Sequence, residues 1–123
     1  IAASEVWFAE FTIFAHGPTA GDIKFGLSVP TGATGQFGGL GHALGIASGM
    51  EADLRTWSDN DIGSQPTMGI VPSTSNTDIY LLRAVIVNST TAGSVTLQWA
   101  QATATSGLTT MRANSYLIAH KVA

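Results

Sequence analysis

Residues 79–101 constrain the fold more than any other segment, because they combine two strand patterns with a polar break between them. Residues 79–87 are apolar except for Arg83, and several are β-branched, as strands prefer. Residues 88–93 favour a turn. Residues 95–101 then alternate between apolar and polar side chains, which is typical of a strand with one buried face. The segment predicts a β-hairpin whose first strand is apolar on both faces.

A second strand with apolar side chains on both faces is predicted near the start of the chain, at residues 5–15. An alternating pattern divides its side chains between two faces, with Trp7, Phe11 and Ile13 on one and Val6, Phe8 and Phe14 on the other, beside Glu10 and Thr12. One face of such a strand packs inside a sandwich, and a large exposed apolar patch on the other face would promote aggregation. The pattern therefore indicates that another subunit covers the outer face.

The remaining strands are shorter and are separated by turns. A strand at 22–29 places Ile23, Phe25, Leu27 and Val29 on one side, and further strands are predicted at 68–71, 109–112 and 115–122, with Asn114 at a turn. The glycine-rich segment 31–49 predicts a loop. Residues 48–57 fit a short helical turn, while a strand at 54–57 is the alternative. Turns about every 8–15 residues indicate an all-β sandwich or barrel.

Composition limits the class of protein. The chain has 123 residues, enough for one domain, and contains no cysteine. Charged residues make up 11% of the chain, against about 25% in ordinary soluble domains. The net charge is -3 and the five basic residues are scattered, which argues against nucleic-acid binding. No apolar run reaches the roughly 18 residues of a membrane span.

Three segments together resemble a module found in many tailed-bacteriophage structural proteins. They are TAGSVTLQWAQATA at 91–104, NSYLIAHKV at 114–122 and DIKFGLSVPTGATG at 22–35. Asn114 stands where that family often has glycine, and asparagine tolerates the left-handed turn conformation that glycine provides there. The resemblance implies a single jelly-roll β-sandwich over residues 1–123, an outline similar to tumour-necrosis-factor-like trimers, and a place on the surface of the phage particle.

The side chains expected to form the core or the subunit interface are mainly aromatic and aliphatic. They are Trp7, Phe8, Phe11, Tyr80, Leu82, Arg83, Leu97, Trp99 and Tyr116. Trp7 and Trp99 could instead be stacking platforms for a ligand. Arg83 could form an ion pair between subunits, with Asp78 as one candidate partner, or it could lie at a sheet edge with its charge in water.

No catalytic, cofactor or metal site is predicted. Asp59–Gly63 begins like a calcium loop but lacks the later ligands of that motif, so it predicts a turn. The glycines at 39–45 do not fit a dinucleotide fingerprint. His16, His42 and His120 have no metal-binding spacing, although a symmetric assembly could gather one histidine from each subunit. Asn88-Ser89-Thr90 matches a glycosylation sequon, which would be incidental in a phage protein.

Three functions remain open at this point. The leading hypothesis is a non-enzymatic virion protein, a homotrimer that decorates the capsid or forms a head or tail appendage and contacts other virion proteins. The alternative is a tail-fibre tip that binds a host receptor or surface glycan through the loop at 31–49. A polysaccharide-cleaving enzyme is the third, because scattered carboxylates can converge in a fold.

Overall fold

The computed structural model describes residues 1–44, 54–57, 61–72 and 77–123. Nine strands and one short 3-10 helix lie in this part of the chain. They are β1 (Val6–His16), η1 (Thr19–Gly21), β2 (Ile23–Ser28), β3 (Thr34–His42), β4 (Leu54–Trp57), β5 (Thr67–Met68), β6 (Asp78–Val87), β7 (Thr96–Gln101), β8 (Thr110–Met111) and β9 (Tyr116–Lys121).

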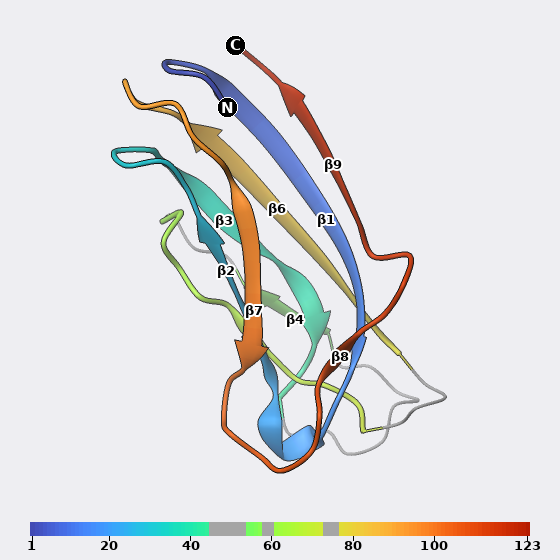
Figure 1. Cartoon of the computed structure of the whole chain (residues 1–123). Helices are drawn as coiled ribbons and strands as arrows, with labels where there is room; N and C mark the ends of the chain where they lie inside the picture. The colour runs from blue at the N-terminus through green and yellow to red at the C-terminus, as the bar shows by residue number, and fades with distance from the viewer. Residues whose placement is uncertain (45–53, 58–60, 73–76) are drawn as a thin grey trace.

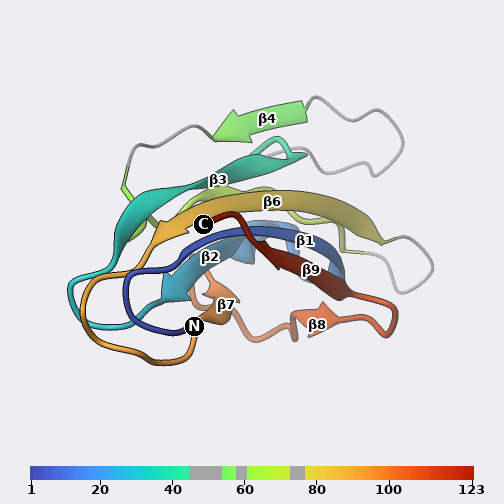
Figure 2. The same ribbon diagram turned by 90° about the horizontal axis from the view of Figure 1, so that it is seen from above.

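The strands form two antiparallel sheets that lie one over the other (Figure 1 and Figure 2). The large sheet has six strands in the order β4-β3-β6-β1-β8, with β9 also paired to β1. The small sheet has the order β5-β2-β7. The prediction of an all-β sandwich is therefore confirmed. The pairs β1–β9, β2–β7 and β3–β6 nest within one another along the chain, but the jelly-roll order itself is not confirmed.

The core lies between the sheets and is built from alternate residues of the long strands. In β6 the even-numbered side chains from Tyr80 to Ile86 are buried, while the odd-numbered ones from Ile79 to Val87 are exposed. From the small sheet, Ile23 and Phe25 enter the core, as their alternation predicted. Fully burying each large apolar side chain contributes about 1.5–3 kcal/mol. This central layer therefore holds the two sheets together.

The predicted hairpin at 79–101 is wrong, although both of its strands exist. Strand β6 pairs with β1 on one side and β3 on the other, while β7 pairs with β2 in the small sheet. The intervening residues thus cross from one sheet to the other. Asn88 stabilises this crossing, since its side-chain amide donates to the carbonyl oxygens of Ala2 at 2.7 Å and Thr91 at 2.9 Å.

The loop predicted at 31–49 is also wrong over much of its length, because β3 occupies Thr34–His42. The many glycines led to the prediction of a loop, because glycine has a low intrinsic preference for strands. Here they allow a close approach between strands. A Cβ atom on Gly39 would overlap the carbonyl oxygen of Leu81, and one on Gly41 would overlap the ring of Tyr80. Glycine is therefore required by the packing of β3 on β6.

The shorter elements follow the sequence with small differences. Residues 54–57 form a strand, so the strand alternative is confirmed there, while 48–53 lie outside the described residues. Strands β5 and β8 are shorter than the predicted 68–71 and 109–112. Asn114 has a φ of 72°, the left-handed conformation expected at its turn. In the described part of the chain, no helix has the length and hydropathy that crossing a membrane requires.

Candidate functional site

The outer face of the large sheet is rich in exposed apolar side chains. The register of β1, β3, β6 and β9 places alternate residues on this face. Its most exposed large members are Ile79, Leu81, Val85, Val87, Tyr116 and Ile118, each at least 39% exposed. Phe8 lies on the same face, with its ring centroid 5.2 Å from that of His120. Contiguous apolar surface of this kind marks an interaction site.

One ion pair lies within this apolar face. Glu10 on β1 and Arg83 on β6 are direct partners in the strand register, and Arg83 Nε donates to Glu10 Oε2 at 2.9 Å. The side chain of Arg83 remains 69% exposed and that of Glu10 30%. Arg83 does not lie at a sheet edge, since β6 is an inner strand, but its side chain reaches water as that alternative expected. Asp78, the suggested partner, points to the opposite face of β6 from Arg83, where it accepts the Val71 N–H at 2.7 Å.

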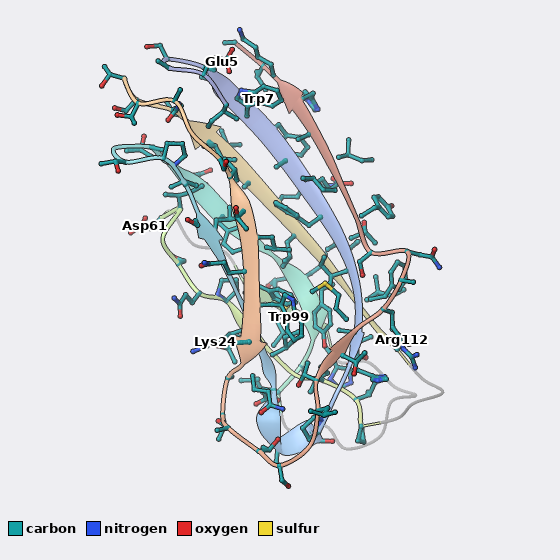
Figure 3. The ribbon with its side chains drawn as sticks, viewed as in Figure 1. Glu5, Trp7, Lys24, Asp61, Trp99 and Arg112 are labelled. Carbon is teal, nitrogen blue, oxygen red and sulfur yellow. The ribbon has the colours of Figure 1, made fainter. Side chains whose placement is uncertain are left out.

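An apolar groove of about 420 Å³ opens on one side of the sandwich. It runs between β7, at the edge of the small sheet, and β8 and β9, at the edge of the large sheet. Its lining includes Trp7 and Phe11 of β1, Leu97 and Trp99 of β7 and Leu117 of β9. In Figure 3, Trp7 lies toward the upper end of the molecule and Trp99 toward the lower end. None of the described lining side chains is charged, so the groove offers apolar and aromatic contacts.

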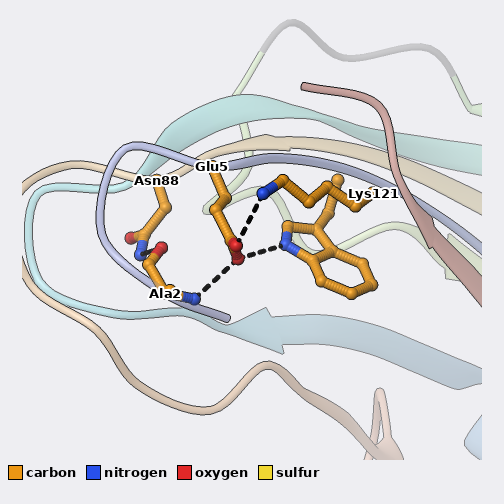
Figure 4. A network of polar contacts seen from close by, with 5 residues as sticks. Ala2, Glu5, Asn88 and Lys121 are labelled. Carbon is orange, nitrogen blue, oxygen red and sulfur yellow. Dashed lines mark hydrogen bonds and ion pairs between the residues drawn. The ribbon is translucent and has the colours of Figure 1, made fainter.

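A polar network holds the end of the groove near the N-terminus (Figure 4). Glu5 Oε2 accepts the indole N–H of Trp7 at 2.9 Å and the backbone N–H of Ala2 at 2.8 Å, and Lys121 lies 3.0 Å from Oε1. These contacts lower the pKa of Glu5 to about 2, the Trp7 hydrogen bond contributing most. The network therefore orients Trp7 through a carboxylate that stays ionised.

A buried polar cluster lies between β6 and the segment after β5. The hydroxyl of Tyr80 donates to the carbonyl oxygen of Gly69 at 2.7 Å and lies 3.3 Å from Asp78 Oδ2. Burial raises the pKa of Asp78, against the opposing effects of the Val71 N–H and the neighbouring histidines. Burial also lowers the pKa of His16, and the nearby charge of Arg112 acts in the same direction. The cluster connects strands, and its carboxyl group resists ionisation.

The predicted site residues separate into three environments. Phe11, Tyr80 and Leu82 are buried in the core. Phe8 and Arg83 lie on the outer face of the large sheet, and Tyr116 lies at its rim, where the outer face meets the groove. Trp7, Leu97 and Trp99 line the groove, and Trp99 is 40% exposed. The structure thus places the exposed members of this set on two surfaces, the outer face of the large sheet and the groove, and the buried members in the core between the sheets.

The histidines do not meet at one point within the chain. Among the described residues, no group of three or more histidine, cysteine, aspartate and glutamate side chains is arranged to hold a metal ion. His16 and His42 are buried, whereas His120 is exposed on β9. In the Asp59–Gly63 segment, Asp59 and Asn60 lie outside the described residues. Asp61 accepts the backbone N–H of Gly63 at 2.9 Å, which confirms a turn there.

Sequence reasoning missed the exposure of β9 and the role of Glu10. Every residue of β9 is exposed, and Leu117 and Ile118 are each 54% exposed on opposite faces of the strand. Two consecutive aliphatic residues in a predicted strand signal apolar surface on both faces, so this feature could have been found. The partnership of Glu10 with Arg83 could not, because it depends on the register between β1 and β6.

Comparisons with known proteins identified no relative: no protein-family model, no curated protein and no solved structure matches the chain.

Proposed function

We propose that this protein is a non-enzymatic structural module of a bacteriophage virion. In this proposal it forms a homotrimer on the particle surface, as a capsid decoration or as a head or tail appendage, and contacts other virion proteins. The phage assignment is supported by the resemblance of residues 22–35, 91–104 and 114–122 to phage structural modules. The association of copies is supported by the outer face of the large sheet.

The apolar outer face is the observation that carries the proposal. Ile79, Leu81, Val85 and Val87 stand in one exposed row on β6, and Ile118 extends the surface onto β9. Removing apolar surface from water contributes about 25 cal/mol per Å². Burial of these side chains against neighbouring copies would therefore favour association. It would also protect a surface that otherwise promotes aggregation.

Sedimentation of the isolated domain at micromolar concentration tests this proposal. We expect a trimer for the natural sequence and a folded monomer for Leu81→Glu, which replaces an apolar side chain of this row with a negative charge. Leu108→Glu is the matched control. Leu108 is 85% exposed and lies in the turn before β8, so this variant should assemble normally. A natural chain that sediments as a stable, soluble monomer would contradict the proposal.

The number of copies in each particle separates the two placements. Hundreds of copies would support capsid decoration, and a handful would support an appendage.

The aromatic groove favours a second candidate function, a receptor- or glycan-binding tip of a tail fibre. Trp99 and Trp7 line an open groove, and exposed tryptophan rings offer flat surfaces on which a sugar ring can stack. Residues 34–42 of the loop first expected to make such contacts form strand β3, so the groove replaces that loop as the candidate surface. Trp99→Ala tests this function. If it assembles normally but loses binding to host glycans or host cells, the tip function replaces decoration.

A further inference from the structure

The ion pair of Glu10 and Arg83 places two charges on the apolar outer face of the large sheet. Among the outward-facing described residues of β1, β3, β6 and β9, Glu10 is the only carboxylate and Arg83 is the only arginine. They lie on β1 and β6, which are inner strands of the sheet, and among apolar neighbours. A partner that buries this face must therefore also cover a charged pair, and burying a charge without a compensating contact is costly.

The bonding capacity of the pair is only partly used within the chain. Arginine carries five N–H donors, and the contact with Glu10 Oε2 uses the one on Nε. The side chain of Arg83 is 69% exposed, so the rest of the guanidinium group is open to an acceptor from outside. Glu10 carries a second carboxylate oxygen that can accept a further donor. Each residue can thus bond a second partner while it keeps the first.

A second copy of this chain presents both of the groups that the pair requires. Its Glu10 supplies an acceptor for Arg83, and its Arg83 supplies a donor for Glu10. Both groups lie side by side on the apolar face, because the two residues are direct partners in the register of β1 and β6. The face is therefore complementary to itself in charge as well as in hydrophobicity.

We propose that Arg83 of each copy bonds Glu10 of the neighbouring copy, and that this contact selects the partner and sets its register. The inference rests on the proposed self-association through the outer face. In a trimer the contacts form a closed ring, in which each Arg83 also keeps the Glu10 of its own chain. Apolar burial drives association, while the charged ring excludes arrangements that leave like charges opposed.

A mixing experiment distinguishes contacts between chains from the contact within one chain. The double variant Glu10→Arg/Arg83→Glu retains an opposite-charge pair within each chain and between identical copies. In a mixed assembly with the natural chain, however, arginine would face arginine and glutamate would face glutamate. The two proteins are unfolded together, refolded as an equimolar mixture and analysed by native mass spectrometry, with one chain carrying a mass tag.

We expect both proteins to assemble but to sort into separate homo-oligomers, with mixed species reduced to a small minority. The control is Glu5→Lys/Lys121→Glu, which reverses an ion pair at 3.0 Å that lies away from the centre of the outer face. It should mix freely with the natural chain. Random mixing of the Glu10→Arg/Arg83→Glu variant would overturn the inference while leaving the proposed assembly intact. A monomeric natural chain would instead contradict the proposed function.

Discussion

A side chain on Gly35 would overlap the backbone carbonyl oxygen of Val85 on the adjacent strand. Gly35 lies in β3 directly opposite Ile86 in the register with β6. Its φ of 145° is a conformation that residues with a Cβ atom rarely adopt. The contact of the glycine-rich strand with the centre of the sheet thus depends on the absence of a methyl group.

Gly35→Ala should lower the free energy of unfolding by at least about 2 kcal/mol, because overpacking adds to the strain of the positive φ. Gly26→Ala is the matched control, since Gly26 lies in β2 and the nearest atom to its added Cβ would be 3.7 Å away. That variant should remain within about 0.5 kcal/mol of the natural chain. Urea denaturation of both variants measures the difference, and equal midpoints would disprove the close approach.

Tyr80→Phe should destabilise the fold by about 1–3 kcal/mol, because it leaves the carbonyl oxygen of Gly69 buried without its donor at 2.7 Å. The ring remains and still packs against Phe25 at a centroid distance of 5.2 Å. The loss therefore reports the hydroxyl group alone. Tyr116→Phe is the control, since Tyr116 is 51% exposed and its hydroxyl can bond water. Thermal melts that do not separate the two variants would contradict this account.

Acidification should weaken the fold through His16. Burial lowers the pKa of His16 below the 6.5 of an unfolded chain, so between these values the unfolded state binds a proton that the folded state resists. The fold has its full stability with respect to His16 above pH 6.5, where the imidazole is neutral in both states. This part of the free energy of unfolding is lost as the pH falls toward the lowered pKa. Asp78 has the opposite effect, because its raised pKa favours proton uptake by the folded state above pH 3.8.

The contribution of His16 is measured by urea denaturation at a series of pH values from neutral to mildly acidic. We expect the natural chain to lose more stability over this range than His16→Gln, which cannot take up the proton. Asp78 is present in both proteins, so its opposing effect largely cancels in the comparison. Identical pH profiles would show that the burial of His16 does not affect the acid stability of the fold.

Phe25 and Trp99 should differ in their contribution to stability, although they are direct partners between β2 and β7. Phe25 is 1% exposed, so Phe25→Ala should cost about 3–5 kcal/mol. Trp99 is 40% exposed in the groove, and its partial burial predicts a loss of about 1–2 kcal/mol in the isolated domain for Trp99→Ala. Denaturation in urea ranks the two variants. A larger loss for Trp99 would mean that another chain closes the groove.

The alternation of side chains was enough to predict β1, β2 and β6 and to assign residues to their faces. The pattern in 79–87 predicted apolar side chains on both sides, and the structure has Tyr80 and Leu82 in the core with Ile79 and Leu81 exposed. This succeeds because the direction of a side chain in a strand follows directly from its position along the chain. The sequence thus indicated that apolar surface would remain exposed, because one core cannot bury apolar side chains on both faces of a strand.

Only the tertiary structure decided which strands are neighbours. Strands pair through backbone N–H and C=O groups, which are nearly the same at every residue. The sequence of one strand therefore does not identify the strand with which it pairs. The connection from β6 to β7 permits either a hairpin or a crossing, and β1 and β3 already occupy both edges of β6. For the same reason, the sequence contained Glu10 and Arg83 but not their contact, which arises only when β1 and β6 pair in this register.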